Sequence, residues 1–432
     1  MRGLRLVVFG TLLGMSASLA GQNGDAKVSV RGTDQTRDGN WRQCRDFDSD
    51  VAIPGCTAVI QSGRETDAYL AIAFNRRGNA YQRKQDFDHA IADYKEAIRL
   101  NPAYALALNN RGGIDWANKD YNHALQDYDE DVRLEPTAPI AFFHRGGAYL
   151  GKQDFDSAIR DFNEAIRLDP GYVPAFEGRA TGYLGKKDYD HALEDFDAII
   201  RLSPGEASGF DGRGIVRNYK GDYDGAIQDF DEAIRLNPRN AAAYDNRGNS
   251  YRGKNDFERA IPDYSEAIRL FPGYFYAFDD RAFAEFHLGQ FAAAQSDFLA
   301  AKKMDPGEAY HALWLYLARS RQGQDGRSEL ETSAAEFKLT GWPGPVVNLY
   351  LGRATTADVL SAASNPDSQK DIEQHCEAYF YLGEQALLEG KSDEAKRLFQ
   401  LAVDTGGKSF YEYSGSIAEL KRMQSTDQNG AH

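Results

Sequence analysis

A 34-residue repeat dominates this chain. Seven arginines follow one another at that spacing: Arg77, Arg111, Arg145, Arg179, Arg213, Arg247 and Arg281. Seven prolines do the same: Pro102, Pro136, Pro170, Pro204, Pro238, Pro272 and Pro306. A repeat of this length predicts a helical hairpin that buries its apolar face by stacking on the next copy. We therefore expect a solenoid with a continuous core, a long concave surface and no built-in catalytic pocket.

The first full repeat shows how each half becomes a helix. One face of a first helix is formed by Phe74, Arg77, Gly78 and Tyr81. Asp86 is placed to cap a second helix. Pro102 ends that helix, because proline cannot continue the hydrogen-bond ladder. The same arrangement recurs through residues 71–308.

The repeat pattern resembles that of a known family. Its large–Gly–Tyr–Ala–aromatic–Ala–Pro positions are Phe74, Gly78, Tyr81, Ala90, Tyr94, Ala97 and Pro102. With these residues the chain resembles the tetratricopeptide-repeat (TPR) proteins over residues 71–308. The resemblance implies an all-α fold, a right-handed superhelix of seven helical hairpins, with partners bound on the concave surface.

One departure from the family is systematic. Arginine stands before the repeat glycine, where the family usually has leucine. Sixteen residues later each repeat has an aspartate: Asp93, Asp127, Asp161, Asp195, Asp229, Asp263 and Asp297. A buried guanidinium needs a carboxylate partner. We therefore predict an Arg–Asp ladder, within or between repeats; the alternative is that both side chains point to solvent.

Outside residues 71–308 the period fails, and further segments are expected. They are a signal peptide (1–20), a disordered linker (21–40), a partial repeat that caps the array (41–70), an irregular helical segment (309–371), a TPR-like helical pair with a final cap (372–425) and a tail (426–432). The segments 377–383 and 395–402 resemble the NlpI-like bacterial envelope adaptors, which implies a scaffold for envelope enzymes.

Residues 1–20 have the pattern of a secretory leader. Arg2 and Arg5 precede an apolar stretch, and Ser18 to Ala20 forms a small-x-small cleavage site. Gln22 stands where a lipoprotein would have its lipidated cysteine. We expect a periplasmic or secreted protein without a lipid anchor or a transmembrane segment; the alternative is an uncleaved anchor.

The exported part of the chain has three cysteines. Cys44 and Cys56 lie on two short predicted helical segments before the first repeat. In an oxidising compartment they are expected to form a disulfide worth roughly 3 kcal/mol. The alternative is two reduced thiols in a small core. Cys376 is expected to be unpaired and buried.

Charge and residue spacing argue against several classes of function. The formal charge is −15, which disfavours nucleic acid and anionic membranes and favours basic partners. His144, His287, His311 and His375 are expected to have no neighbouring Cys, Asp or Glu at metal-ligand spacing, and His89, His123 and His191 are expected to be exposed polar residues of the second helices. The acids at 129–131 and 231–232 are expected on solvated faces of second helices. We expect no catalytic residue, metal or cofactor.

First-helix positions beside the core stripe are expected to line the groove. One such position contains Asn75, Asn109, Phe143, Glu177, Asp211, Asp245 and Asp279. Neighbouring positions add Asp280 and Trp116. The predicted partner-binding groove consists of Trp116, Phe143, Glu177, Asp211, Asp245, Asp279 and Asp280. Its acidic track favours a partner segment with basic residues; the alternative is an acidic face that is merely solvated.

The favoured function is an exported, non-catalytic scaffold that binds proteins or peptides in the bacterial envelope. Two alternatives belong to other classes. A self-associating structural protein is suggested by aromatic residues expected on the surface of the last repeat: Phe275, Tyr276, Phe283 and Phe286. An enzyme or enzyme subunit would have its site in residues 309–425.

Overall fold

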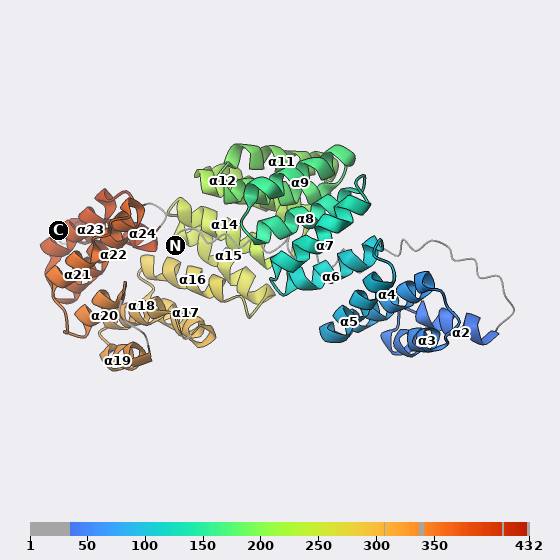
Figure 1. Cartoon of the computed structure of the whole chain (residues 1–432). Coiled ribbons are helices and arrows are strands. Elements are labelled where there is room, and N and C mark those ends of the chain that lie inside the picture. Colours follow the sequence, from blue (N-terminus) through green and yellow to red (C-terminus); the bar gives the residue numbers. More distant parts are fainter. Residues whose placement is uncertain (1–34, 306, 337–340, 408–409, 430–432) are drawn as a thin grey trace. The chain divides into compact units, whose positions relative to one another are not determined.

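Helices form the regular structure throughout residues 35–305, 307–336, 341–407 and 410–429, which the computed structural model describes (Figure 1). This confirms the all-α class. The predicted signal peptide and residues 21–34 of the predicted linker lie outside the described residues. The chain divides into two compact units, within the first turn of α12 (Ala207–Lys220). We call their described parts the N-terminal unit (35–209) and the C-terminal unit (210–429).

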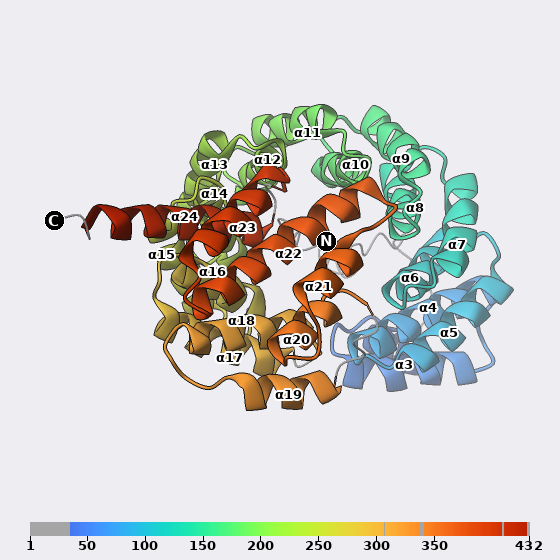
Figure 2. The ribbon, with the colours of Figure 1, turned by 90° about the vertical axis from the view of Figure 1, so that its left-hand side faces the viewer.

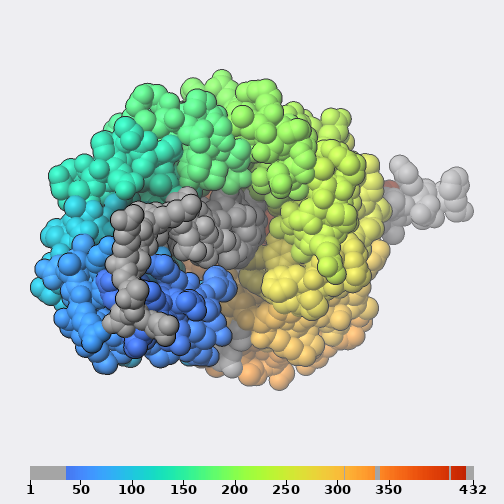
Figure 3. All heavy atoms as spheres, turned by 90° about the vertical axis from the view of Figure 1, so that its right-hand side faces the viewer, coloured from blue at the N-terminus to red at the C-terminus, as the bar shows by residue number. Residues whose placement is uncertain are grey.

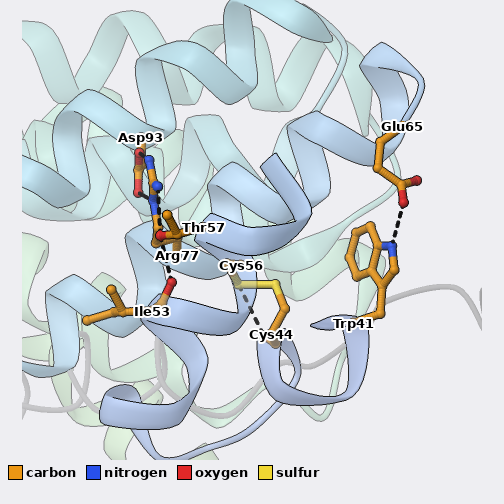
Figure 4. Close-up of a disulfide and its surroundings, with 8 residues drawn as sticks. All are labelled: Trp41, Cys44, Ile53, Cys56, Thr57, Glu65, Arg77 and Asp93. Carbon is orange, nitrogen blue, oxygen red and sulfur yellow. Dashed lines mark hydrogen bonds and ion pairs between the residues drawn. A yellow bond between two sulfur atoms is a disulfide. The ribbon is translucent and has the colours of Figure 1, made fainter. Parts of the chain in front are cut away.

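The N-terminal unit opens with two helices, α2 (Gln35–Cys44) and α3 (Ser49–Gln61). The prediction of a disordered linker is wrong for residues 35–40, which belong to α2. Arg37 explains the difference, because its Nε and Nη2 atoms both donate to the Glu65 carboxylate at 2.8 Å. The indole of Trp41 is buried and donates to the same carboxylate at 3.1 Å (Figure 4). These contacts fix α2 against the start of the array.

Cys44 and Cys56 form the predicted disulfide, which joins α2 to α3 (Figure 4). Both residues are buried with Trp41 and Val59 in a small apolar cluster. The bond therefore covalently closes a cap whose own core is too small to hold two short helices together strongly. Cys376, in the C-terminal unit, is a free buried cysteine.

Replacing Cys44 and Cys56 together by serine is expected to loosen this cap. A crosslink across so short a loop contributes roughly 3 kcal/mol, mostly by restricting the unfolded chain. Hydrogen exchange followed by mass spectrometry should show faster exchange in residues 35–61. Exchange in the hairpins of the C-terminal unit provides the internal control. Unchanged exchange in 35–61 would mean that packing of Trp41 and Val59 alone holds the cap.

Seven helical hairpins follow the cap. Their first helices are α4 (Asp67–Arg83), α6 (Ala105–Ala117), α8 (Pro139–Gly151), α10 (Val173–Gly185), α12 (Ala207–Lys220), α14 (Ala241–Gly253) and α16 (Phe275–His287). Their second helices are α5 (Phe87–Leu100), α7 (Tyr121–Leu134), α9 (Phe155–Leu168), α11 (Tyr189–Leu202), α13 (Tyr223–Leu236), α15 (Phe257–Leu270) and α17 (Phe291–Met304). Helix α4 begins four residues before the predicted repeat boundary at residue 71. Figure 3 shows the hairpins of the N-terminal unit as a continuous run of atoms, coloured from blue to green.

Local sequence explains why each hairpin turns and stacks. In α9 the side chain of Asp154 caps the helix by accepting from the backbone N–H of Ser157. The ring of Phe162 then packs between two glycines of consecutive first helices. A Cβ atom at Gly146 would lie 2.9 Å from this ring, and one at Gly178 would lie 2.6 Å from it. The glycines are therefore required for close approach of neighbouring repeats.

The structure confirms the Arg–Asp ladder, within each repeat. Nε and Nη2 of each repeat arginine donate to the carboxylate of the aspartate sixteen residues later, at 2.5–3.2 Å. All seven aspartates are buried. Such two-point contacts between first and second helices are among the stronger polar interactions in proteins.

The ladder arginines also make two further contacts. Six of the seven guanidinium groups lie 5.4–5.9 Å from the centre of an aromatic ring three residues earlier, at Phe74, Phe142, Phe176, Phe210, Tyr244 and Phe278. Several Nη1 atoms reach the preceding repeat; that of Arg179, for example, donates to Asn163 at 2.5 Å. Every ion pair of the ladder thus links the two helices of a repeat, and several of them also contact the preceding repeat.

The remaining helices of the C-terminal unit are irregular in length. They are α18 (Ala309–Ser320), α19 (Arg327–Glu336), α20 (Gly344–Tyr350), α21 (Thr356–Ala363), α22 (Ser368–Leu388), α23 (Ser392–Asp404) and α24 (Tyr411–Asn429). Residues 426–429 are part of α24 and not of a separate tail. Trp314 is fully buried and contacts rings of the last repeat and of α22, including Phe286 and Phe380. One core therefore continues from the last repeat into these helices.

Helix α24 is held in place by a buried charge cluster. Arg321, at the end of α18, donates from Nη1 to Glu384 of α22 at 2.9 Å and lies 3.2 Å from Glu419 of α24. Both glutamates are buried. From this anchor α24 runs beside α16 (Figure 2). Helix α24 therefore packs against a helix of the last repeat.

Candidate functional site

Three predicted groove residues lie in the N-terminal unit. Phe143 is only 5% exposed and makes an edge-on contact with the Tyr172 ring, at 5.5 Å between centroids. It is therefore a core residue rather than an open groove residue. Trp116 is half-buried and donates from Nε1 to the backbone carbonyl of Gly147 at 3.2 Å. Glu177 is half-buried, and burial raises its pKa. Trp116 and Glu177 thus retain some exposed surface.

A buried polar cluster beside Phe143 was missed by the sequence analysis. Asn109 donates from Nδ2 to Asp131 at 3.3 Å and lies 2.7 Å from Nδ1 of His144. Asp131 was predicted on a solvated face, but it is 3% exposed. Burial raises the pKa of Asp131 to about 7, a rise that the Asn109 hydrogen bond opposes. Burial also lowers the pKa of His144 to about 4.

The repeat register contains the signal for this cluster. The residues equivalent to Asp131 in the other repeats are apolar: Ala97, Ala165, Ile199, Ala233, Ala267 and Ala301. All of them are fully buried. A carboxyl group therefore replaces a core methyl or alkyl group in the second repeat alone. A comparison of each position across the repeats would have found it.

The acidic track of the C-terminal unit is largely enclosed. Asp245 is 1% exposed and Asp280 is 6% exposed. Burial, with Asp280 nearby, raises the pKa of Asp245 well above its usual value. Burial also raises the pKa of Asp211 to about 6, against the effect of the neighbouring Asn246 and Asn240 amides. These carboxyl groups do not form the open, fully charged track that the sequence predicted.

Tyr411, the first residue of α24, explains why the end of this track is covered. Its hydroxyl is hydrogen-bonded to Asp280, and its ring stacks on Phe283 with 3.8 Å between centroids. The guanidinium of Arg252 lies 4.5 Å from the centre of the same ring. Sequence analysis missed Tyr411, because nothing in the repeat pattern indicates which later residue packs against α16.

What remains open is a cleft at the end of the repeats, which we call the acidic cleft. Its lining residues are Phe275, Tyr276, Asp279, Asp280, Phe283, Asp305, Glu308, His311 and Tyr411. His311 donates from Nε2 to Asp279 at 2.8 Å when that nitrogen is protonated. Aromatic rings and carboxylates facing one space suit a cationic group.

The exposed aromatic patch expected for self-association is smaller than predicted. Phe283 and Phe286 are buried, because α24 and Trp314 pack against them. Phe275 and Tyr276 are half-buried. Phe271 is 55% exposed and was not anticipated. The prediction that Phe283 and Phe286 form a surface patch is wrong.

Among the described residues, no set of three or more His, Cys, Asp or Glu side chains is arranged to hold a metal ion. None of the helices described is both long and apolar enough to cross a bilayer.

Comparison with known proteins identifies the repeats. Tetratricopeptide-repeat family models match residues 71–104, 139–172 and 213–275. Among curated proteins, a lipoprotein NlpI homolog from Haemophilus influenzae is 32% identical over 120 residues. The match covers 27% of this chain and 38% of that protein, so the chain spans about two fifths of the relative's length.

Solved structures with a similar helical arrangement include two repeat proteins. A tetratricopeptide repeat protein from Parabacteroides merdae aligns with a TM-score of 0.49 and 21% identity, over 57% of this chain and 98% of that one. YrrB, described as a TPR protein with an unusual peptide-binding site, aligns with a TM-score of 0.35 and 23% identity, over 43% of this chain and 95% of that one.

Proposed function

Because this chain is a tetratricopeptide-repeat protein with a segment similar to an NlpI homolog, we propose that it is a non-catalytic adaptor for protein or peptide partners. The observation that carries the proposal is the acidic cleft. It lies where the last repeat meets the C-terminal helices, and carboxylates and aromatic rings line it together. A net charge of −15 adds long-range attraction for basic partners.

The rigidity of the repeats also supports an adaptor. Seven buried Arg–Asp pairs connect the two helices of every hairpin. A frame that does not reorganise on binding loses little conformational entropy, which favours affinity. The exposed parts of the Trp116 and Glu177 side chains offer further contact points on the N-terminal unit.

The proposed place of action is the bacterial envelope. Two observations support export: the disulfide of Cys44 and Cys56, which persists in oxidising compartments, and the similarity to a lipoprotein homolog. The leader pattern of residues 1–20 agrees with them.

The test is capture of partners from cells that make the full chain with a C-terminal tag. We expect the tagged chain in the periplasmic or secreted fraction, where it should retain at least one protein after washing. That protein, once purified, should bind the tagged chain directly, with its own mass unchanged. Its affinity should fall as salt rises from 50 to 300 mM, because screening weakens attraction between charges.

Three outcomes would contradict the proposal. Recovery of the chain alone would favour a self-associating protein, which mass photometry at several concentrations would identify. A partner whose mass changes on incubation would indicate an enzyme. A chain found only in the cytoplasm would exclude the envelope role.

A further inference from the structure

We infer that the acidic cleft binds an arginine side chain of the partner, an inference that rests on the adaptor function proposed above. Four carboxyl groups line the cleft, from Asp279, Asp280, Asp305 and Glu308. They come from α16 and from the segment that joins α17 to α18, so two separate parts of the chain place acids around one space. A cation entering there would meet carboxylates from both.

Acidic side chains outnumber basic ones among the residues that line the cleft. The single basic side chain among the described lining residues is His311, which contacts Asp279. Arg252 does not line the cleft, but its guanidinium faces the Tyr411 ring, and its charge opposes the rise in the pKa of Asp280 that burial causes. Asp305 forms no ion pair within the described part of the chain. The Asp279 Oδ1 atom is enclosed and accepts no hydrogen bond there, although a buried carboxylate oxygen normally has a partner.

The walls of the cleft favour a planar cation. Phe275 and Tyr276 lie side by side with 4.0 Å between ring centroids. Phe283 and Tyr411 are stacked on each other, and Arg252 lies over the Tyr411 ring, so Phe275 and Tyr276 are the rings left for a partner group. A guanidinium group can stack on such rings and also donate to two carboxylate oxygens in its plane. A lysine ammonium lacks the planar fork and is more strongly hydrated.

The chain itself uses this combination to hold guanidinium groups. Arg179 lies 5.4 Å from the centre of the Phe176 ring while it donates to both oxygens of Asp195. Five other ladder arginines repeat the arrangement. Apart from Tyr411 and Asp280, beside which Arg252 lies, the acidic cleft presents the same two kinds of group, aromatic rings and carboxylates, with no arginine among its described lining residues. An arginine from a partner would complete it.

The test uses three blocked pentapeptides, with arginine, lysine or citrulline between pairs of glycines. Citrulline has almost the shape of arginine but no charge. Each peptide is titrated into the full chain at low salt, and binding is followed by NMR or calorimetry. We expect the arginine peptide to bind with a millimolar dissociation constant. Lysine should bind several-fold more weakly and citrulline at least tenfold more weakly.

A matched pair of variants locates the binding. Asp305→Asn/Glu308→Gln removes two charges from the cleft and should weaken arginine binding at least tenfold. Glu258→Gln/Asp393→Asn removes two exposed charges from the first turns of α15 and α23 and should change it less than twofold. Equal losses in the two variants would show that only overall charge matters and would overturn the inference.

The comparison of the three peptides on the unmodified chain needs no variant, so it remains decisive if the cleft variant does not fold. Equal binding of the arginine and citrulline peptides, or no binding of either, would also overturn the inference. A different result would contradict the adaptor function. If a purified partner binds the cleft variant as tightly as the unmodified chain, the arginine site is wrong but the adaptor function is still supported. If no partner is captured at all, the proposed adaptor function is wrong.

Discussion

Replacing Arg179 by leucine is expected to lower the free energy of unfolding of the N-terminal unit by roughly 3 to 5 kcal/mol, the usual cost of breaking a buried ion pair from one side. Leucine is the residue that TPR proteins usually have at this position, so the shape of the site is tolerated. The cost arises from Asp195, which is 2% exposed and would lose the guanidinium that contacts both its oxygens. Urea unfolding followed by circular dichroism measures the change.

The free energy of unfolding that Arg179→Leu loses should increase with pH. Burial already raises the pKa of Asp195, and Arg179 opposes that rise. Without the arginine the folded-state pKa rises further, so ionisation of Asp195 disfavours the folded state as pH increases. The destabilisation should therefore be greater at pH 8 than at pH 5. The same loss at both values would mean that lost packing dominates.

Two further variants separate charge from packing. Arg179→Leu/Asp195→Ala should recover more than half of the loss, because no unpaired buried carboxylate remains. Arg167→Leu disrupts an exposed pair with Glu164 in the same unit and should leave the unfolding midpoint nearly unchanged. Since repeat arrays can unfold in parts, hydrogen exchange should show that the effect begins in α10 and α11. If the double variant recovers none of the lost free energy of unfolding, the unpaired charge of Asp195 is not the cause of the loss.

Replacing Asp131 by alanine is expected to stabilise the N-terminal unit by roughly 2 to 4 kcal/mol at pH 8. The upper value follows from a pKa raised from 3.8 to about 7, since each unit corresponds to about 1.4 kcal/mol. The lower value allows for loss of the Asn109 hydrogen bond. Alanine is also the buried residue at the equivalent position in five of the other six repeats.

The stabilisation by Asp131→Ala should increase with pH. A carboxyl group whose folded-state pKa is raised disfavours folding when ionised, so its cost is absent below pH 4 and complete above pH 7. The gain from Asp131→Ala should therefore appear between pH 4 and 7 and remain constant above. Asp88→Ala removes an exposed carboxylate in the first turn of α5 and should show no such gain. A gain for Asp131→Ala that is the same at pH 4.5 and pH 8 would contradict the assignment to ionisation.

The repeats themselves were accessible from sequence. The 34-residue spacing of Arg77 and its equivalents predicted the hairpins and, with the aspartates sixteen residues later, the ladder. The hairpins and the ladder could be predicted from local spacing, because the face of a helix on which a side chain lies depends on its position in the helical turn. The disulfide was predicted for a similar reason, since Cys44 and Cys56 lie on two short adjacent helices.

The candidate site was predicted only in part. Asp279 and Asp280 were placed in the groove, and they do line the acidic cleft. Phe143 and Asp245 were placed there too, but both are buried. A position beside the core stripe can be exposed or covered, and what packs over it decides which. For Asp131, the register across repeats would have indicated burial; for Asp245, nothing in its own repeat does.

Sequence by itself determined the hairpins, their ladder and the cap disulfide of this protein, because each depends on residues at most a few tens of positions apart. Only the tertiary structure decided what covers the last repeat. Tyr411 reaches Asp280 across 131 positions of chain. Such a contact forms because α24 is anchored by Arg321 and Glu419 and lies beside α16. No periodicity encodes it, and it gives the acidic cleft one of its walls.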